Sequence, residues 1–399
     1  MTRTQRDIPL FPDYVPGDSD HDFMAKARAQ APLARDKLGI VTAFSLADML
    51  DFNDDRWTRQ VELEGLWASG VTSGPMYDFV DNVLLFANGT AHKNRRTPLA
   101  RTFAHPVVAA LRPEIQSRAR DLIAPLVGTG RVDFIDRIAS PLPARIIAAI
   151  LGAPEDEADQ FGAMVYSAIR GLGFCSDDVR AESDRDMARL TAYVGALLRD
   201  RQSRPQQDFL TAYLARVQDG PLSEIEIRAQ IAGLVLAGSD TTRGALTSTV
   251  SHVLQRPDQW QMLVDDPDTH VPGAVAEGLR FDPVIGALAR ITTEPREVHG
   301  YQLPKGSLVS GSMLTALRDP AVYADPDRFD ITRDDHPRLH PVFGGGPHRC
   351  LGEALARIEL EEALRALVTL APHMQLGGDP CRLRGYSAVR QISPLSVVM

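Results

Sequence analysis

A proline-free segment of unusual length sets the scale on which this chain must fold. It begins near Ser223, where Ser223 and Glu226 form the S-x-x-E pattern of a helix capping box, and no proline follows until Pro257. The pattern predicts one helix of about 30 residues, which at 1.5 Å per residue is about 45 Å long. Glycines at positions 233, 238 and 244 each cost about 1 kcal/mol relative to alanine, which suggests that something approaches this helix closely.

The rest of the chain divides by pattern into consecutive parts. Residues 1–60 are rich in short strands, and residues 91–281 repeat apolar positions at helical spacing. Residues 282–352 carry strands, a proline-rich meander and a glycine-rich loop, and residues 353–399 carry a last helix and final strands. Because no linker or repeat separates them, we expect a single domain over residues 1–399, mainly α with a small β region.

Composition excludes several classes of protein. The chain is 44% hydrophobic and 24% charged, which is typical of globular proteins, and its net charge of -9 gives no support to nucleic-acid binding. Residues Met1 to Pro12 lack the apolar segment of a signal peptide, and no apolar run of about 18 residues occurs. Three cysteines are too few and too far apart for a disulfide framework. We therefore expect a cytoplasmic protein without a membrane segment.

Cys350 lies in the sequence Phe343-Gly-Gly-Gly-Pro-His-Arg-Cys350-Leu-Gly352, after a glycine-rich loop and at the predicted start of a helix. Free N–H groups and the helix dipole at such a position favour the thiolate. The loop has three interpretations: a turn that caps a helix, a phosphate cradle, or a metal site with one cysteine. The phosphate-binding G-x-x-x-x-G-K-[ST] pattern is absent, and one cysteine cannot hold structural zinc alone. Haem iron accepts a single axial thiolate.

These ten residues match the F-G-x-G-x-H-x-C-x-G signature of the cytochromes P450 at every fixed position, so the chain resembles that superfamily in its soluble bacterial form. The resemblance implies that Cys350 is the axial ligand of the iron of haem b, held in a cradle that includes Gly344. It also implies that Phe343 shields the sulfur and that His348 reaches a haem propionate. The implied fold is the triangular P450 fold, with the haem between the long distal helix and the helix after the cysteine loop.

A second motif, Ala237-Gly-Ser-Asp-Thr-Thr242, lies inside the long predicted helix. Such a patch is more often an ordinary polar stretch of helix than a catalytic one. Here it resembles the P450 A-G-x-D-T-T segment. The resemblance implies that Asp240 and Thr241 deliver protons during oxygen activation, and that Gly238, beside Ala237, makes room for oxygen and substrate.

Two further groups of residues follow from the resemblance. Haem propionates need cations or hydrogen-bond donors when partly buried, and the expected set is His92, Arg96, Arg290 and His348. The pair Glu277 and Arg280, placed on a short helix after Pro272, resembles the P450 E-x-x-R motif. It is expected to fasten to the meander with Arg328 as the third member, in a structural role.

The activity implied is that of a monooxygenase, which inserts one oxygen atom from O2 into a small to medium hydrophobic substrate by hydroxylation or O-dealkylation. The expected pocket residues are apolar: Leu234, Val284, Leu288 and Val389. Because the sequence carries no flavin or nicotinamide fingerprint, electrons are expected from a ferredoxin-type partner and its reductase, and the chain is expected to be a monomer. The partner would dock at the positive side chains Lys93, Arg95, Arg101, Arg112, Arg349 and Arg357. Two alternatives are a haem-binding sensor or carrier without oxygenase activity and a peroxide-dependent enzyme.

Overall fold

The protein is described here by a computed structural model that covers residues 7–154, 157–172 and 175–399. The chain forms two compact units. Unit 1 contains Met1–Val61, Ser248–Cys350 and Asp379–Pro394, and unit 2 contains Glu62–Thr247, Leu351–Gly378 and Leu395–Met399. The chain therefore enters each unit three times, and the units do not coincide with the four consecutive parts expected from the sequence. Two of the expected boundaries, near residues 60 and 352, lie within two residues of a change of unit.

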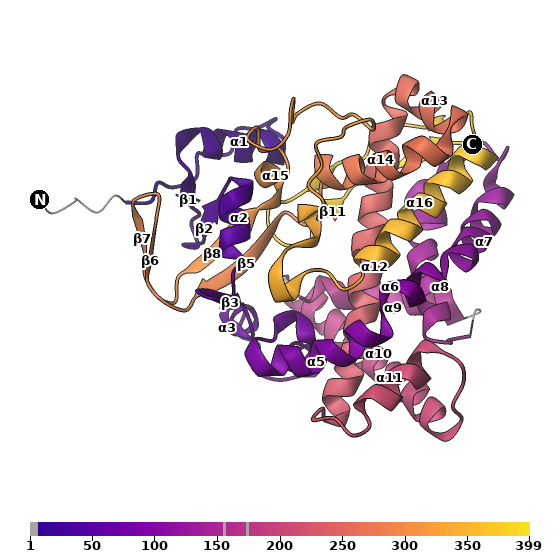
Figure 1. Ribbon diagram of the computed structural model, residues 1–399, viewed down its shortest axis with the longest axis horizontal. Helices are drawn as coiled ribbons and strands as arrows, with labels where there is room; N and C mark the ends of the chain where they lie inside the picture. Colours follow the sequence, from indigo (N-terminus) through magenta and orange to yellow (C-terminus); the bar gives the residue numbers. More distant parts are fainter. Residues whose placement is uncertain (1–6, 155–156, 173–174) are drawn as a thin grey trace, which may run out of the picture. The chain divides into compact units, whose positions relative to one another are not determined.

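Unit 1 is built around a five-stranded sheet in the order β1-β2-β8-β5-β3, in which only the β2–β8 pair is parallel (Figure 1). The strands of unit 1 are β1 (Leu33–Arg35), β2 (Val41–Ala43), β3 (Thr58–Gln60), β5 (Ala287–Thr292), β6 (Arg296–Val298), β7 (Tyr301–Leu303), β8 (Leu308–Ser312), β10 (Leu383–Arg384) and β11 (Gln391–Ile392). Its helices are α1 (Asp20–Gln30), α2 (Leu46–Phe52), α13 (Pro257–Asp265), α14 (Pro267–Phe281), α15 (Met313–Ala316) and the short η5 (Pro341–Phe343) and η6 (Gly346–His348). Strands β6 and β7 pair as an antiparallel hairpin.

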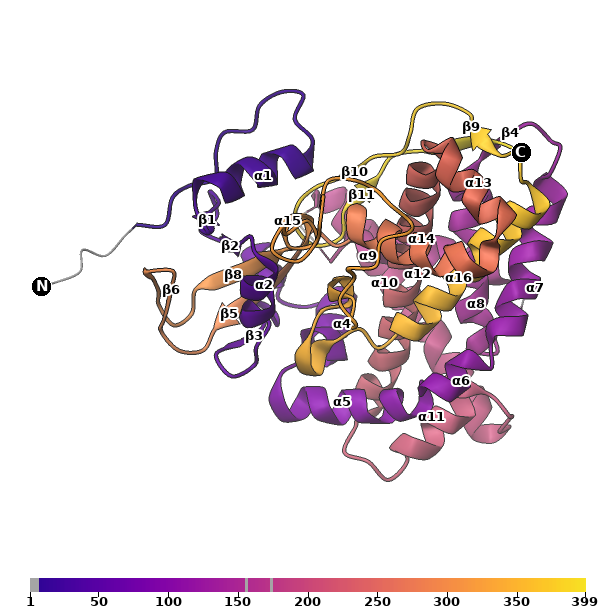
Figure 2. The ribbon, with the colours of Figure 1, turned by 45° about the horizontal axis from the view of Figure 1, so that its top comes forward.

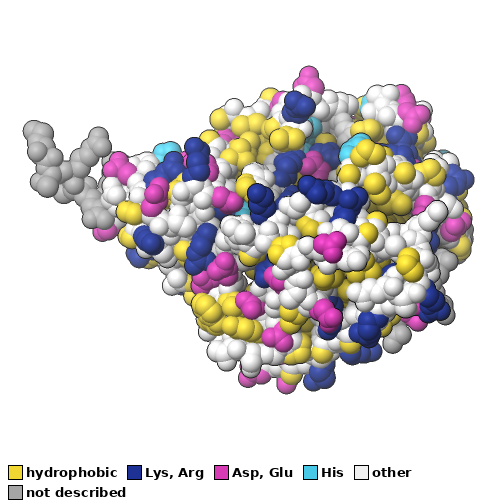
Figure 3. All heavy atoms as spheres, turned by 60° about the horizontal axis from the view of Figure 1, so that its bottom comes forward, with side chains coloured by type: hydrophobic (Ala, Val, Ile, Leu, Met, Phe, Trp, Pro, Cys, Tyr) yellow, Lys and Arg dark blue, Asp and Glu magenta, His cyan; other side chains and the backbone are white. Residues whose placement is uncertain are grey.

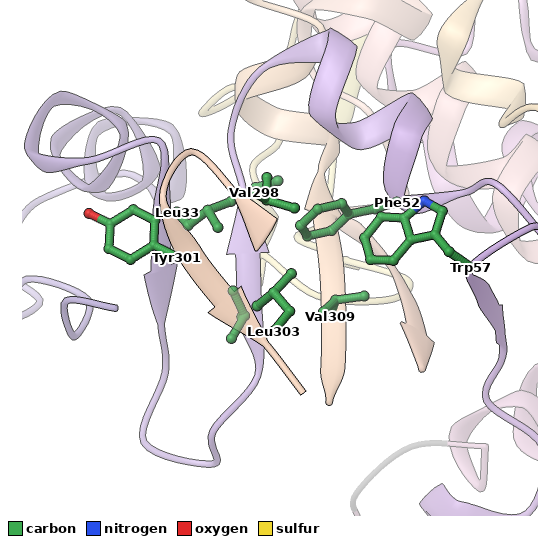
Figure 4. Packing of buried hydrophobic residues seen from close by; sticks show 9 residues of the cluster. Leu33, Phe52, Trp57, Val298, Tyr301, Leu303 and Val309 are labelled. Atoms are coloured by element: carbon green, nitrogen blue, oxygen red, sulfur yellow. The ribbon is translucent and has the colours of Figure 1, made fainter. Parts of the chain in front are cut away.

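A hydrophobic cluster covers one part of this sheet. Phe52 and Trp57 meet edge to face, with ring centroids 5.4 Å apart, beside side chains of β8 and the β6–β7 hairpin (Figure 4). The indole N–H of Trp57 donates to the carbonyl of Asp51 at 2.9 Å, so this buried ring keeps its polar atom paired. The segment between α2 and β3 is thereby anchored at both ends.

Unit 2 is mostly helical, with a three-stranded antiparallel sheet in the order β4-β12-β9. Helix α16 packs along α7, as Figure 2 shows in yellow and purple. The helices are α3 (Glu64–Ala68), α4 (Pro75–Asn82), η1 (Leu84–Phe86), α5 (Gly89–Thr102), α6 (His105–Ala109), α7 (Arg112–Ile123), η2 (Ala124–Leu126), η3 (Ile135–Ala139), α8 (Pro141–Ile150), α9 (Ala158–Arg170), α10 (Asp177–Ser203), α11 (Phe209–Val217) and α16 (Glu353–Leu370). The strands are β4 (Arg131–Asp133), β9 (Gln375–Leu376) and β12 (Ser396–Val398).

The long helix expected after Ser223 is confirmed as α12 (Glu224–Leu254), with 31 residues. Its capping box is present, because the backbone N–H and the hydroxyl of Ser223 both bond to the Glu226 carboxylate, at 2.9 and 3.0 Å. The glycines of this helix mark close approaches. A Cβ at Gly233 would lie 2.5 Å from Cγ2 of Val83, and one at Gly238 would lie 2.9 Å from Cδ1 of Ile147.

One expected helix boundary was wrong. Helix α14 begins at Pro267, not after Pro272, because the Asp266 side chain accepts a hydrogen bond from the N–H of Thr269 and caps an earlier start. Pro272 lies inside the helix, where it removes one backbone hydrogen bond. Strand β2 begins only at Val41, because Gly39, with φ +87°, forms a turn before it. The last helix begins at Glu353, where the last expected part of the chain begins.

The surface mixes side-chain types. Figure 3 shows acidic, basic and hydrophobic side chains side by side on one face of the molecule. Within the described residues, no helix has both the length and the apolar character needed to cross a membrane.

Gly278 provides a test of packing between α14 and the end of α12. A Cβ at Gly278 would lie 2.1 Å from Oγ1 and 2.6 Å from Cγ2 of Thr249. We expect Gly278→Ala to lower the free energy of unfolding by about 1–3 kcal/mol, measured by chemical denaturation. The matched control is Gly65→Ala in α3, where a Cβ meets nothing within 4 Å and helix propensity favours alanine. Equal effects of the two substitutions would contradict the packing role.

Candidate active site

The cysteine loop of unit 1 is closed by its own backbone. The N–H of Cys350 donates to the carbonyl of Phe343 at 2.8 Å, and Cys350 itself is exposed. Gly344 and Gly346 have φ angles of +71° and +60°, which residues with a side chain rarely adopt. The glycines are therefore needed for the turn that brings residues 343 and 350 together.

Two side chains missed as positioning residues hold this loop in place. Arg349 was expected on the docking surface, but its guanidinium donates to the carbonyl of Gly344 at 2.8 Å and lies 6.0 Å from the centroid of the Phe343 ring. His340 accepts from the N–H of Val342 at 3.3 Å, and its Nε2 lies 3.0 Å from the carbonyl oxygen of Ala276 in α14. The two ring nitrogens of His340 thus connect the loop to α14.

Two of the four expected propionate ligands lie in unit 1 and share one partner. Arg290 of β5 forms an ion pair with Asp55, and its Nε donates to Oγ1 of Thr58 at 3.1 Å. His348 lies in η6, and its Nε2 is 3.4 Å from the other carboxylate oxygen of Asp55. Arg290 is 1% exposed, and burial lowers the pKa of its guanidinium, with Asp55 opposing that shift. Arg290 and His348 therefore converge on a carboxylate.

Three of the expected pocket residues also belong to unit 1. Val284 is buried, Leu288 is half-buried with its Cδ1 3.7 Å from the Cβ position of Gly344, and Val389 is 39% exposed. A bridge between Ile285 and Val389 joins their two segments. The structure therefore brings Leu288 to the cysteine loop and Val389 to the segment that carries Val284.

The expected structural network is present around Glu277 and Arg280, which are both 0% exposed. Nε and Nη2 of Arg280 donate to the two carboxylate oxygens of Glu277, at 2.7 and 2.8 Å. The expected third member was wrong, because the guanidinium of Arg328 is 68% exposed and only its carbonyl reaches Arg280. The arginine that reaches Glu277 is Arg333, with Nε 3.4 Å from the carboxylate.

In unit 2, the residues of the Ala237–Thr242 motif lie on different faces of helix α12. Ala237 is exposed, and the hydroxyl of Thr241 donates to the Ala237 carbonyl at 2.8 Å, so these two residues share one open face with the half-buried Leu234. Gly238 lies on another face of the helix, where a Cβ would meet Ile147 of α8. The absence of a Cβ at position 238 allows α8 to pack against α12, and the room that Gly238 is expected to make for oxygen and substrate stays a prediction.

Asp240 is held by a cation from its own helix. Its carboxylate pairs with Arg243, whose guanidinium lies 4.3 Å from the centroid of the Tyr166 ring. The Tyr166 hydroxyl donates to the carbonyl of Ser140 at 3.0 Å. Burial raises the pKa of Asp240 above its usual value, although Arg243 opposes the shift.

A buried carboxyl near this group was missed by the sequence reasoning. Glu359 in α16 is almost completely buried, and burial raises its pKa well above the usual range. Burial chiefly raises the pKa of Tyr166 as well, with Asp240 and Glu359 contributing to the rise. The sequence signal for Glu359 was its position between the apolar residues Ile358 and Leu360.

The remaining expected residues lie on α5. His92 is buried and Arg96, four residues later, is half-buried, so both lie on one side of the helix. Arg95, expected for partner docking, is instead buried, and it pairs with Glu226 and donates to the carbonyls of Asp81 and Val83. It fastens α5 to the start of α12.

Arg112, also expected for docking, is held by α16. It donates to Glu361 at 2.8 Å and to Glu362 at 2.5 Å. Lys93 and Arg101 are exposed.

Comparison with known proteins identifies the family. The sequence model of the family described as Cytochrome P450 matches residues 185–370. The plant-inducible cytochrome P450-pinF1 of Rhizobium radiobacter is 38% identical over 392 residues, which are 97% of this chain and 92% of the relative. Luteothin monooxygenase of Streptomyces thioluteus is 33% identical over 379 residues, covering 94% and 92%. The crystal structure of P450BioI in complex with a fatty-acid-ligated acyl carrier protein matches with a TM-score of 0.86 and 27% identity, covering 95% of this chain and 98% of that chain.

The chain belongs to the cytochrome P450 family. It is a P450 monooxygenase whose cofactor is haem b, and its activity requires O2, a small substrate and a redox partner. The residues of unit 1 fit this cofactor, because Arg290 and His348 are arranged around a carboxylate, the chemical group of a haem propionate, and the glycine loop leaves the Cys350 side chain exposed.

The corrected network can be tested with two arginines five residues apart. Arg333 is 6% exposed and donates to the carbonyls of Ala324, Asp325 and Arg328, whereas the exposed side chain of Arg328 pairs with Asp330. We expect Arg333→Ala to lower the free energy of unfolding by about 2–4 kcal/mol and Arg328→Ala by less than about 0.5 kcal/mol, measured by chemical denaturation. The reverse order would restore Arg328 as the third member.

Proposed function

We propose that this P450 inserts one oxygen atom from O2 into a small to medium hydrophobic substrate, by hydroxylation or O-dealkylation. The observation that carries the proposal is the closed glycine loop, which leaves Cys350 exposed in the unit where Arg290 and His348 meet one carboxylate. In this proposal Cys350 binds the iron, Phe343 covers the sulfur, and Arg290 and His348 bind a propionate. His92 and Arg96, which both lie on α5, also bind a propionate in this proposal.

Bound haem supplies the redox chemistry of oxygen activation, and the protein supplies the sulfur, the protons and the shaped pocket. For the protons we propose Asp240 and Thr241. The Thr241 hydroxyl already donates its hydrogen to Ala237, so its oxygen can accept a hydrogen bond from water on the open face of α12. The raised pKa of Asp240 favours the form that carries a proton, and Arg243 holds its carboxyl in one orientation. This acid and alcohol pair favours O2 over peroxide as the oxidant.

The substrate class is inferred from the proposed pocket residues Leu234, Val284, Leu288 and Val389. All four are aliphatic, so they bind substrate through apolar contact and offer no charge to pair with a substrate carboxylate.

For electrons we propose a ferredoxin-type partner with its reductase, in the cytoplasm. The exposed cations Lys93 and Arg101 of α5 supply positive charge to an acidic partner. The other expected docking arginines contribute less, because Arg112 is held by two glutamates and Arg357 lies 3.4 Å from Glu353.

The thiolate assignment has a direct spectroscopic test. The reduced protein with carbon monoxide is expected to give the red-shifted Soret band of thiolate ligation, and Cys350→Ser is expected to lose it. Cys175→Ser is the matched control, because Cys175 is half-buried outside the loop, and it should keep the band. A normal band in Cys350→Ser would overturn the assignment.

The proton-delivery role of Asp240 is tested by Asp240→Asn. We expect kcat for O2-dependent turnover to fall by about 10²-fold, since positioned general acids contribute on that order. In the wild type, kcat should fall as the pH rises through the raised pKa of Asp240, because the protonated form is lost, and this limb should disappear in Asp240→Asn.

The control for Asp240→Asn is the same protein's reduced carbon monoxide spectrum and its substrate-induced spin shift, both of which should be unchanged. An unchanged kcat with an unchanged pH profile would remove Asp240 from the proton pathway.

A further inference from the structure

Asp55 is a carboxylate that the P450 resemblance does not assign, yet it is the shared partner of Arg290 and His348. It lies in the segment between α2 and β3, and its side chain is 36% exposed. Its two oxygens are divided between the partners: Oδ1 pairs with Arg290, and Oδ2 lies 3.4 Å from Nε2 of His348. The same carboxylate therefore meets both unit 1 side chains proposed to bind a propionate.

The backbone around Asp55 is fixed by neighbours on both sides. The N–H groups of Trp57 and Thr58 both donate to the carbonyl of Asp54, at 3.3 and 3.1 Å, which closes a turn around Asp55. Trp57 is buried against Phe52, and Thr58 begins the strand that pairs with β5. Asp55 is thus held opposite Arg290 by sheet register and core packing.

Arg290 has donors for more than one carboxylate. Its Nε bonds to Thr58 and its Nη2 to Asp55, and among the described residues Nη1 makes no hydrogen bond. A guanidinium offers five N–H donors in a planar fork, so one arginine can serve two acceptors at once. Because Arg290 is almost completely buried, its charge is divided between those acceptors with little screening by water.

We propose that Asp55 is a third carboxylate of the haem-propionate site, which shares Arg290 and His348 with the propionate and so adds negative charge beside the haem. This proposal rests on the propionate roles proposed above for Arg290 and His348. Two consequences follow from the charge. Ferric haem carries one more positive charge than ferrous haem, so Asp55 favours the ferric state and lowers the reduction potential. Asp55 also competes for Arg290 and His348, so it weakens their hold on the propionate.

The test is Asp55→Asn in the holoenzyme, because asparagine keeps the size of the side chain and an acceptor for Arg290 while removing the charge. Spectroelectrochemical titration is expected to show the ferric–ferrous equilibrium shifted toward ferrous by about threefold to tenfold, where tenfold corresponds to about 59 mV. Transfer of haem to an excess of apomyoglobin is expected to be severalfold slower than in the wild type.

Asp54→Asn is the matched control. Asp54 is the preceding residue, and its side chain bonds to the exposed Arg56 and not to Arg290. Asp54→Asn should therefore leave haem transfer unchanged and shift the potential less. A potential shift in Asp55→Asn no larger than that of Asp54→Asn, or haem transfer as fast as in the wild type or faster, would overturn the proposal.

Arg290→Lys separates this proposal from the one on which it depends. Lysine keeps the charge at this buried position but loses the planar fork, so faster haem transfer is expected if Arg290 binds a propionate. Wild-type haem transfer in Arg290→Lys would remove the propionate role and, with it, the role of Asp55. Fast transfer in Arg290→Lys together with wild-type behaviour of Asp55→Asn would remove the role of Asp55 alone.

Discussion

The cysteine loop depends on a buried ion pair that lies in α14. Charges taken out of water are tolerated only when their hydrogen-bonding capacity is filled, and Arg280 meets that condition completely. Its five N–H donors reach the two oxygens of Glu277 and the carbonyls of Leu317, Pro326 and Arg328. The pair thereby fastens α14 to the irregular meander, which has little regular structure of its own. His340 then connects the same helix to the start of the cysteine loop.

Sheet register plays the corresponding part for the cationic groups. In the antiparallel pairing of β3 with β5, Thr58 lies opposite Thr292 and Gln60 opposite Arg290, so the Arg290 side chain runs back toward Thr58 and Asp55. A slip of one residue would send that side chain to the other face of the sheet. The propionate-binding chemistry proposed for Arg290 is therefore a consequence of strand pairing as much as of residue type.

The features that could be predicted from sequence are those written in local patterns. The capping box at Ser223, the length of α12 and the paired side chains of Glu277 and Arg280 each depend on residues a few positions apart, so spacing alone indicates them. Contacts made by backbone carbonyls leave no such pattern, because every residue has one. That is why Arg328 was chosen for its side chain when its carbonyl makes the bond. Long-range partners such as Asp55 for Arg290, or Glu226 for Arg95, were equally invisible.

Two aspartates paired with arginines show why proximity to a cation does not decide the chemistry of a carboxyl group. Asp54 is half-buried, and hydrogen bonds from Arg56 lower its pKa to about 2, because burial costs its charge little there. Asp240 also pairs with an arginine, yet its pKa is raised, because the cost of burying its charge outweighs the attraction of Arg243. The burial of Asp240 in α12 therefore matters more to its proton than the identity of its partner.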